Sequence, residues 1–204
     1  MLLGQTWDEG HLISQGKITI NYLFSLGRID DDIFRREYHS PIYYSFKYLF
    51  LQIFPIKYQI EANHIINLIF SFGVILGIKK LCKIFFNDKV GKITFLILFL
   101  FPAFHGHMAF NSKDTIIAFC HVWIFYYLIK YIQNQSKTES VKYFYNIGIL
   151  SALGTGINLF FFGSLIPIFL FIIYEVFIGK KILDKRFKLK SFFLDILKSF
   201  FIFY

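Results

Sequence analysis

Two clusters of polar residues in this chain have the residue types and spacing that chemistry at a membrane surface requires. The first is the adjacent pair of carboxylates Asp8 and Glu9. One carboxylate of such a pair can act as a general base because its neighbour raises its pKa, and the pair can also help to hold a divalent metal. A solvated loop explains the same dipeptide equally simply, so the pair alone does not identify a site.

The second cluster lies in residues 104–114, FHGHMAFNSKD, between two apolar stretches. It brings His105 and His107 close to Lys113 and Asp114, and polar groups at membrane depth are costly unless they are used or paired. The histidines are two residues apart and do not share a helix face, which excludes a helical zinc pair of the i, i+4 kind. Two interpretations stay open: a metal site of both histidines with Asp114, and a structural role in which Asp114 complements a helix dipole.

The elements that must position these clusters are membrane helices. The chain has 204 residues, of which 56% are hydrophobic and only 17% charged, whereas a soluble domain carries about 25% charged residues. Several apolar runs approach the ~20 residues that cross the hydrocarbon core as a helix. The chain is therefore predicted to be an all-α, polytopic integral membrane bundle. Its net charge of +9 is then explained by lysines and arginines in the loops on one side of the membrane, and no nucleic-acid partner is expected.

The chain is predicted to divide into two parts. Residues 1–61 form an outward-facing first loop with an amphipathic helix from His11 to Leu26 and an interfacial helix that stops at Pro55. Residues 62–204 form the transmembrane bundle, in which the glycines of 146–178 divide a stretch too long for one span. The predicted spans cover residues 62–79, 93–110, 114–132, 146–158, 162–178 and 192–204.

Charge predicts the orientation of the bundle. Lysine and arginine gather in three loops, and such loops face the cytoplasm in membrane proteins; they are residues 79–92, 130–142 and 179–190. The alternate segments, 1–61, 104–113 and 157–163, then face outward. Both polar clusters are therefore predicted to share the extracytoplasmic side. His121 follows Asp114 by seven residues on the same helix face, and is either its partner or a packed polar residue.

Four motifs follow one another in an order that is typical of one group of membrane enzymes. They are WDE at 7–9, HSPIYY at 39–44, FHGHMAFNSKD at 104–114 and a glycine-rich helix pair at 148–167. Together they resemble the C-type membrane glycosyltransferases, the group that holds the protein O-mannosyltransferases and the aminoarabinose transferases of lipid A. The third motif is similar to a signature of a bacterial, polytopic branch of that group.

The resemblance implies a reaction and roles for residues. A sugar would pass, with inversion, from a polyprenyl-phosphate donor to an acceptor glycan, lipid or protein on the extracytoplasmic face of a bacterial inner or plasma membrane. Asp8 would be the catalytic base or an organiser of metal or acceptor, accompanied by Glu9, and Asp114 would be a second acid. We expect Lys113, His107 and His105 to counter the charge of the donor phosphate. No cofactor is certain, and a divalent metal stays possible.

Three departures from the family pattern qualify this interpretation. Family members have a span before the acidic pair and several more spans at the end, which predicts that this chain is truncated at both ends and inactive alone. The glycine-rich pair has Gly156, Ile157 and Asn158 where relatives carry a glycine followed by lysine or arginine, so one expected phosphate ligand is missing.

A non-enzymatic polytopic protein is the main alternative. The glycine-broken helices of 146–178 suit a transporter or a lipid-binding scaffold. Transporters often contain inverted repeats, but residues 62–132 and 146–204 show no such internal symmetry.

Overall fold

The computed structural model describes residues 7–26, 28, 42–102, 104, 108–110, 112–135, 140–179 and 194. Within these residues the chain is helical and contains no strand, which confirms the predicted all-α class. The principal elements, in chain order, are α1 (Trp7–Phe24), α2 (Ile42–Leu51), η2 (Ile56–Tyr58), α3 (Gln59–Phe85), α4 (Asp88–Leu100), α6 (Ser112–Gln133), α7 (Ser140–Thr155), α8 (Phe161–Ser164), α9 (Ile166–Tyr174) and the π-helical turn η3 (Glu175–Gly179).

Three helical stretches among the described residues are long and apolar enough to cross a membrane. They are Ile56–Phe85, Lys113–Gln133 and Phe161–Gly179. They contain the predicted spans 62–79, 114–132 and 162–178, where the sequence offers an apolar run of sufficient length. Together with the all-helical fold, they identify an integral membrane protein.

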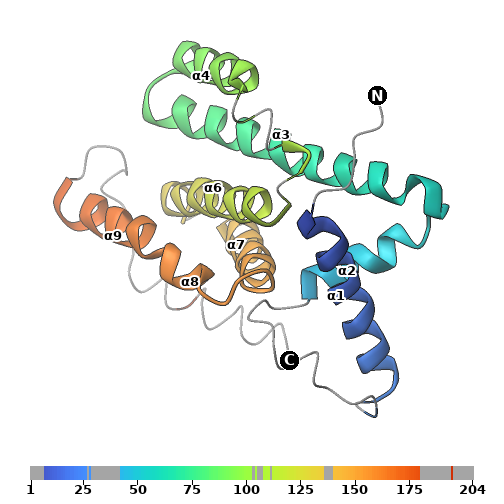
Figure 1. The fold of residues 1–204 in the computed structure, drawn as a ribbon. Helices are drawn as coiled ribbons and strands as arrows, with labels where there is room; N and C mark the ends of the chain where they lie inside the picture. The colour runs from blue at the N-terminus through green and yellow to red at the C-terminus, as the bar shows by residue number, and fades with distance from the viewer. Residues whose placement is uncertain are drawn as a thin grey trace.

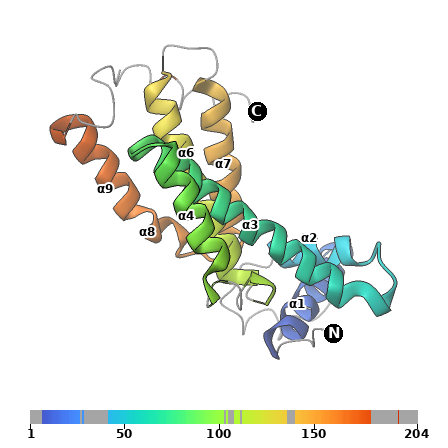
Figure 2. The same cartoon turned by 90° about the horizontal axis from the view of Figure 1, so that it is seen from above.

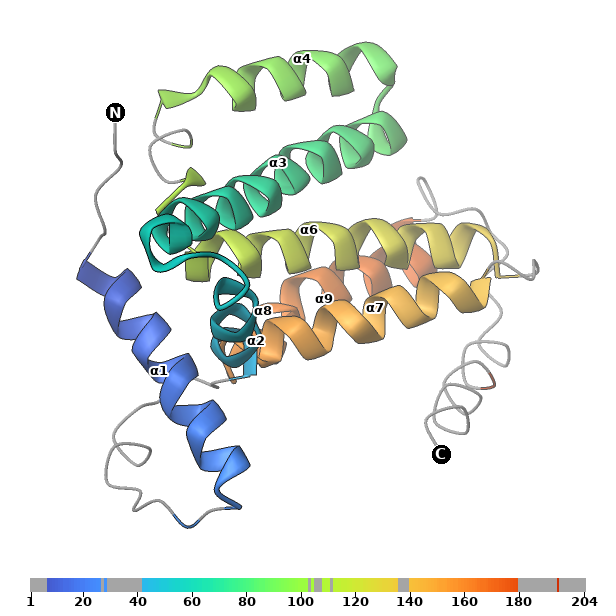
Figure 3. The same cartoon turned by 90° about the vertical axis from the view of Figure 1, so that its right-hand side faces the viewer.

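The helices form a bundle in which α4, α3, α6 and α7 lie in sequence, each packed against the next (Figures 1 and 3). The α3–α4 turn, the end of α6 and the start of α7 lie at one end of this bundle, on the right in Figure 3. We call it the lysine-rich end, because the described residues there include Lys79, Lys80, Lys83, Lys89, Lys92, Lys130 and Lys142. The helices α1 and α2 lie together at the opposite end, away from α9 (Figure 2).

Small residues let α3 and α6 approach closely. A Cβ atom on Gly73 would stand 2.6 Å from the ring of Phe119, and one on Gly77 would stand 2.5 Å from Val122. The indole nitrogen of Trp123 uses this proximity to donate a hydrogen bond to the carbonyl of Gly73, at 3.0 Å. Membrane helices associate through such small-residue contacts and cross-helix hydrogen bonds, because lipid tails offer little hydrophobic drive.

One face of α6 forms the centre of the core. The buried residues recur there every four positions, as a helix with one buried face requires; they are Ile116, Cys120, Ile124 and Leu128. Phe161 and Leu165 pack on this face from the α8 region, and Tyr43 and Tyr44 pack on it from α2. The helix α2 is thus joined to the bundle by aromatic side chains.

Proline changes the second predicted span. The helix expected over 93–110 begins at Asp88 and ends at Leu100, and Phe101 is extended with φ −71° and ψ 114°. The ring of Pro102 disfavours the helical conformation of the residue before it, so the helix stops there. The stretch Asp88–Leu100 has 13 residues, about 20 Å of helix.

Other boundaries also shift. The amphipathic helix expected over His11–Leu26 is α1 and begins at Trp7, and the interfacial helix is α2. The span expected over 146–158 is α7 and begins earlier, at Ser140. The expected break in the glycine-rich stretch falls between Thr155 and Phe161. Apart from Leu194, the span predicted over 192–204 lies outside the described residues.

Candidate functional site

The predicted acidic residues lie in the first turns of two helices. Asp8 and Glu9 belong to the first turn of α1, although their side chains are outside the described part of the structure. Lys113 and Asp114 belong to the first turn of α6, with Asp114 exposed and Lys113 half-buried. Both helix starts lie at the end of the bundle opposite the lysine-rich end (Figure 3). A helix start carries partial positive charge and free N–H groups, and so suits an anion.

His105 and His107 lie outside the described residues. No group of three His, Cys, Asp or Glu side chains that could hold a metal occurs among the residues that the structure describes. A metal site that includes these two histidines therefore stays a prediction.

Two buried polar side chains of α3 hold the segment that leads into α6. The amide nitrogen of Asn67 donates a hydrogen bond to the carbonyl of Ala109 at 2.7 Å, and the hydroxyl of Ser71 donates one to the carbonyl of Met108 at 3.0 Å. Both side chains are fully buried. They supply donors to the carbonyls of two buried residues, and a buried carbonyl without a donor would be costly.

A ring contact completes this attachment. The imidazole of His64 packs edge-on against the ring of Phe110, with ring centroids 5.1 Å apart. His64, Asn67 and Ser71 fall on one face of α3, at spacings of three and four residues. The position of the α6 start, and of Lys113 and Asp114 with it, is thus fixed by α3.

Sequence reasoning had overlooked this polar face of α3. Asn63, His64, Asn67 and Ser71 are all buried, and they interrupt a span that is otherwise apolar. Polar side chains on one face of a membrane helix normally face the bundle interior and have partners there. That periodicity was the available signal, but it could not show that the partners are carbonyls some forty residues further along the chain.

His121 is a packed polar residue that joins α6 to α8. Its Nδ1 lies 2.8 Å from the carbonyl of Ile117, and its Nε2 lies 2.7 Å from the hydroxyl of Ser164. A carbonyl only accepts, so Nδ1 carries a hydrogen. The ring also packs edge-on against Phe161 at 4.6 Å. Of the two interpretations of His121, the structure supports the packed residue: its two ring nitrogens contact α6 and Ser164.

The lysine-rich end contains a separate network of opposite charges. Asp88 forms ion pairs with Lys92 at 2.8 Å and with Lys83 at 3.0 Å. Hydrogen bonds from these two ammonium groups lower the pKa of Asp88 to about 2. Asp88 begins α4, directly after Asn87, whose side chain caps the helix by accepting a hydrogen bond from the N–H of Val90. The network closes the turn between α3 and α4.

Comparison with known proteins yields one family. Residues 38–203 match the family model of the dolichyl-phosphate-mannose-protein mannosyltransferases, which confirms the resemblance to C-type glycosyltransferases. The match contains the whole 104–114 cluster, while Asp8 and Glu9 precede it. No curated protein and no solved structure matches the chain.

Proposed function

Since the chain belongs to the dolichyl-phosphate-mannose-protein mannosyltransferase family, we propose that it transfers a sugar from a polyprenyl-phosphate donor to an acceptor on the extracytoplasmic face of a bacterial inner or plasma membrane. The family consists of glycosyltransferases that use lipid-linked donors. The acceptor is a hydroxyl group of a glycan, lipid or protein. The family match is the observation that carries this proposal.

The proposed reaction is a single displacement. The carboxylate of Asp8 removes the proton of the acceptor hydroxyl, and the oxygen attacks the anomeric carbon of the donor sugar. The bond between that carbon and the phosphate oxygen breaks, and the lipid phosphate leaves with the electron pair. Attack opposite the leaving group inverts the configuration at the anomeric carbon.

The second cluster would stabilise the leaving group. Lys113, His105 and His107 supply positive charge beside the departing phosphate, and the first turn of α6 adds the partial charge of its N–H groups. Asp114, in the same turn, is the second acid of the site and organises the acceptor or a divalent metal. Glu9 accompanies Asp8 and sustains its basicity.

The fold supports this division of roles in two ways. The first turns of α1 and α6 lie at the same end of the bundle (Figure 3). The start of α6 is also held in place through Asn67 and Ser71. A positioned cation and a positioned base are what a displacement at a lipid phosphate needs.

The test measures transfer from radiolabelled polyprenyl-phosphate sugars by the full protein in membranes, for the wild type and for Asp8→Asn and Asp114→Asn. A general base contributes roughly 10²- to 10⁴-fold, so Asp8→Asn should lower the rate by at least about 100-fold while membrane insertion is kept. Asp88→Asn is the matched control, because it removes a carboxylate at the lysine-rich end. Wild-type transfer in EDTA decides whether a divalent metal takes part.

Two results would contradict the proposal in different ways. Undiminished transfer by Asp8→Asn would remove the assignment of the base and leave the family activity intact. No transfer by the wild type from any polyprenyl-phosphate sugar would favour the non-enzymatic alternative, a transporter or a lipid-binding scaffold.

A further inference from the structure

Lys80 and Lys130, at the lysine-rich end, have aromatic neighbours and no acidic partner among the residues that the structure describes. Lys80 of α3 places its Nζ 4.7 Å from the ring centroid of Trp123 and 5.4 Å from that of Tyr126. Lys130 of α6 places its Nζ 5.9 Å from the ring centroid of Tyr126. Within the described residues neither lysine forms an ion pair, whereas Lys83 and Lys92 are both paired with Asp88.

Both ammonium groups therefore lie beside the ring of Tyr126. Like charges held near one another repel, and the repulsion is stronger beside a membrane than in water. Aromatic faces offset part of this cost. An anion between Lys80 and Lys130 would offset the rest, and both side chains are accessible enough to receive one, since Lys80 is exposed and Lys130 half-buried.

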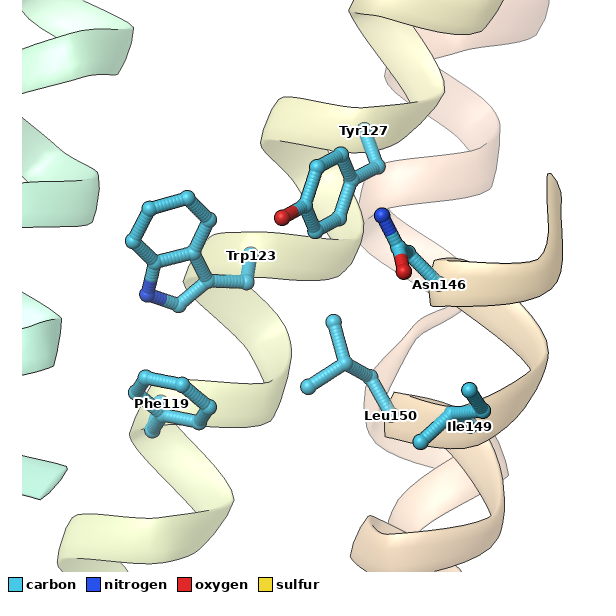
Figure 4. A pocket seen from close by; sticks show the side chains of 6 residues that line it. All are labelled: Phe119, Trp123, Tyr127, Asn146, Ile149 and Leu150. Atoms are coloured by element: carbon cyan, nitrogen blue, oxygen red, sulfur yellow. The ribbon is translucent and has the colours of Figure 1, made fainter. Parts of the chain in front are cut away.

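A groove begins beside the same aromatic residues. It has a volume of about 230 Å³ and lies between α6 and α7 (Figure 4). Its walls are Phe119, Trp123, Tyr127, Asn146, Ile149 and Leu150. Trp123 belongs both to this groove and to the contact with Lys80, so the ammonium of Lys80 lies beside one wall of the groove.

The groove changes in polarity along the axis of α6. Tyr127 and Asn146 face each other at the end of the groove toward the end of α6 and the start of α7 (Figure 4). Phe119, Ile149 and Leu150 line the part that lies deeper in the bundle. The surface thus offers the ammonium of Lys80 beside Trp123, a hydroxyl and an amide toward the lysine-rich end, and apolar walls deeper in the bundle.

These three kinds of group match the parts of a phospholipid: a phosphate headgroup, ester carbonyls and an acyl chain. We propose that Lys80 and Lys130 bind the phosphate of an anionic membrane phospholipid whose acyl chain lies in the groove between α6 and α7. The cytoplasmic leaflet is the source of this lipid, because lysine-rich ends face the cytoplasm and anionic lipids concentrate there. Lys130 lies toward the other end of α6 from Asp114, so the proposed phosphate position is separate from the proposed donor site.

The experiment is a titration of the purified full protein with phosphatidylglycerol in detergent micelles, followed by native mass spectrometry. One phosphatidylglycerol should bind tightly, and phosphatidylcholine more weakly. The double variant Lys80→Gln/Lys130→Gln should bind phosphatidylglycerol about 30-fold more weakly, since each lysine beside an anionic lipid contributes about 1 kcal/mol. The double variant Lys83→Gln/Lys92→Gln, with the same loss of charge at the same end, should bind as the wild type does.

A substitution in the groove tests whether the acyl chain of the lipid lies there. Leu150→Trp fills the space while both lysines stay, and should also weaken phosphatidylglycerol binding. If the two lysine double variants bound phosphatidylglycerol with equal affinity, the proposal would be overturned, because the lipid would then be attracted only by the overall positive charge of this end. Polyprenyl phosphate could also compete for this site with the affinity of phosphatidylglycerol. If the variant Lys80→Gln/Lys130→Gln abolished that competition, the site would belong to the sugar donor and the proposal would be overturned. Binding is measured without sugar transfer, so the outcome does not depend on the proposed reaction.

Discussion

At the scale of single residues, polar side chains hold irregular backbone inside the membrane. Asn67 and Ser71 are fully buried and donate to the carbonyls of Ala109 and Met108, which are buried as well. A hydrogen bond between membrane helices contributes on the order of 0.6 to 2 kcal/mol, because the unfolded chain in a membrane also finds partners. These residues matter for position as much as for stability, since the turn leads directly into the helix that carries Lys113 and Asp114.

Removing the hydroxyl of Ser71 should therefore affect both the stability of the protein and the position of the α6 start. Ser71→Ala leaves the carbonyl of Met108 without its donor and should lower the free energy of unfolding by about 1 kcal/mol. Thermal unfolding in lipid nanodiscs measures the loss, and the transfer assay should show a lower rate. The matched control is Ser151→Ala in α7, where the retained backbone carbonyl of Ser151 still accepts from Thr155. Equal unfolding temperatures for both variants would contradict the role of Ser71.

At the scale of elements, the sequence predicted the long apolar helices well and the polar contacts poorly. The spans 62–79 and 114–132 follow from stretches that are apolar on average, and this average needs no tertiary information. The helix expected over 93–110 is interrupted at Phe101, because an apolar count ignores the local effect of Pro102 on the residue before it. The partners of Asn67 and Ser71 could not be predicted, because they depend on how α3 packs against a turn distant in sequence.

The candidate site was predictable only in part. The starts of α1 and α6 come to the same end of the bundle (Figure 3), and alternation of lysine-rich and lysine-poor loops was sufficient to predict that arrangement. The roles of Asp8, Glu9, His105 and His107 rest on the resemblance to the family and remain predictions, since their side chains lie outside the described residues.

The interface between α3 and α6 gives a prediction for this scale. Gly77→Ala would place a Cβ 2.5 Å from Val122 and 3.2 Å from the indole nitrogen of Trp123, so the helices must separate. We expect a loss of roughly 1–3 kcal/mol in the free energy of unfolding, as for other overpacked sites. Gly148→Ala in α7 is the control, because a Cβ there meets nothing within 4 Å and should even favour the helix.

Denaturation in a mild detergent compares these two variants directly. A Gly77→Ala protein as stable as Gly148→Ala would show that α3 and α6 are not packed as closely as their glycines indicate.

At the scale of the whole molecule, charge separates the two ends of the bundle. The described lysines of the 79–92 and 130–142 segments gather at one end, and the first turns of α1 and α6 lie at the other (Figure 3). The proposed lipid site and the proposed transfer site thus face opposite leaflets. The positive-inside rule assigns the lysine-rich end to the cytoplasm, and the chain's own cysteines allow a test of that orientation.

Cys82 is free and partly exposed near the lysine-rich end, whereas Cys120 is free and fully buried. A membrane-impermeant maleimide should label Cys82 only after the cytoplasmic face of the membrane is opened, and should not label Cys120. In a variant without these cysteines, Leu159→Cys places a thiol at an exposed position in the break between α7 and α8. That thiol should react in intact cells. Labelling of Cys82 in intact cells would reverse the proposed orientation.

The shortness of α4 has a consequence for the lipid around the protein. This helix of 13 residues, about 20 Å long, packs beside the membrane-spanning α3 and exposes Ile93, Leu96, Ile97 and Leu100, while the hydrocarbon core measures about 30 Å. Hydrophobic mismatch of this size is relieved where the bilayer thins or the helix tilts, at a cost that grows with each ångström. We therefore expect the bilayer to adapt to the apolar face of α4, so that the acyl-chain length of the host membrane acts on the segment between α4 and α6.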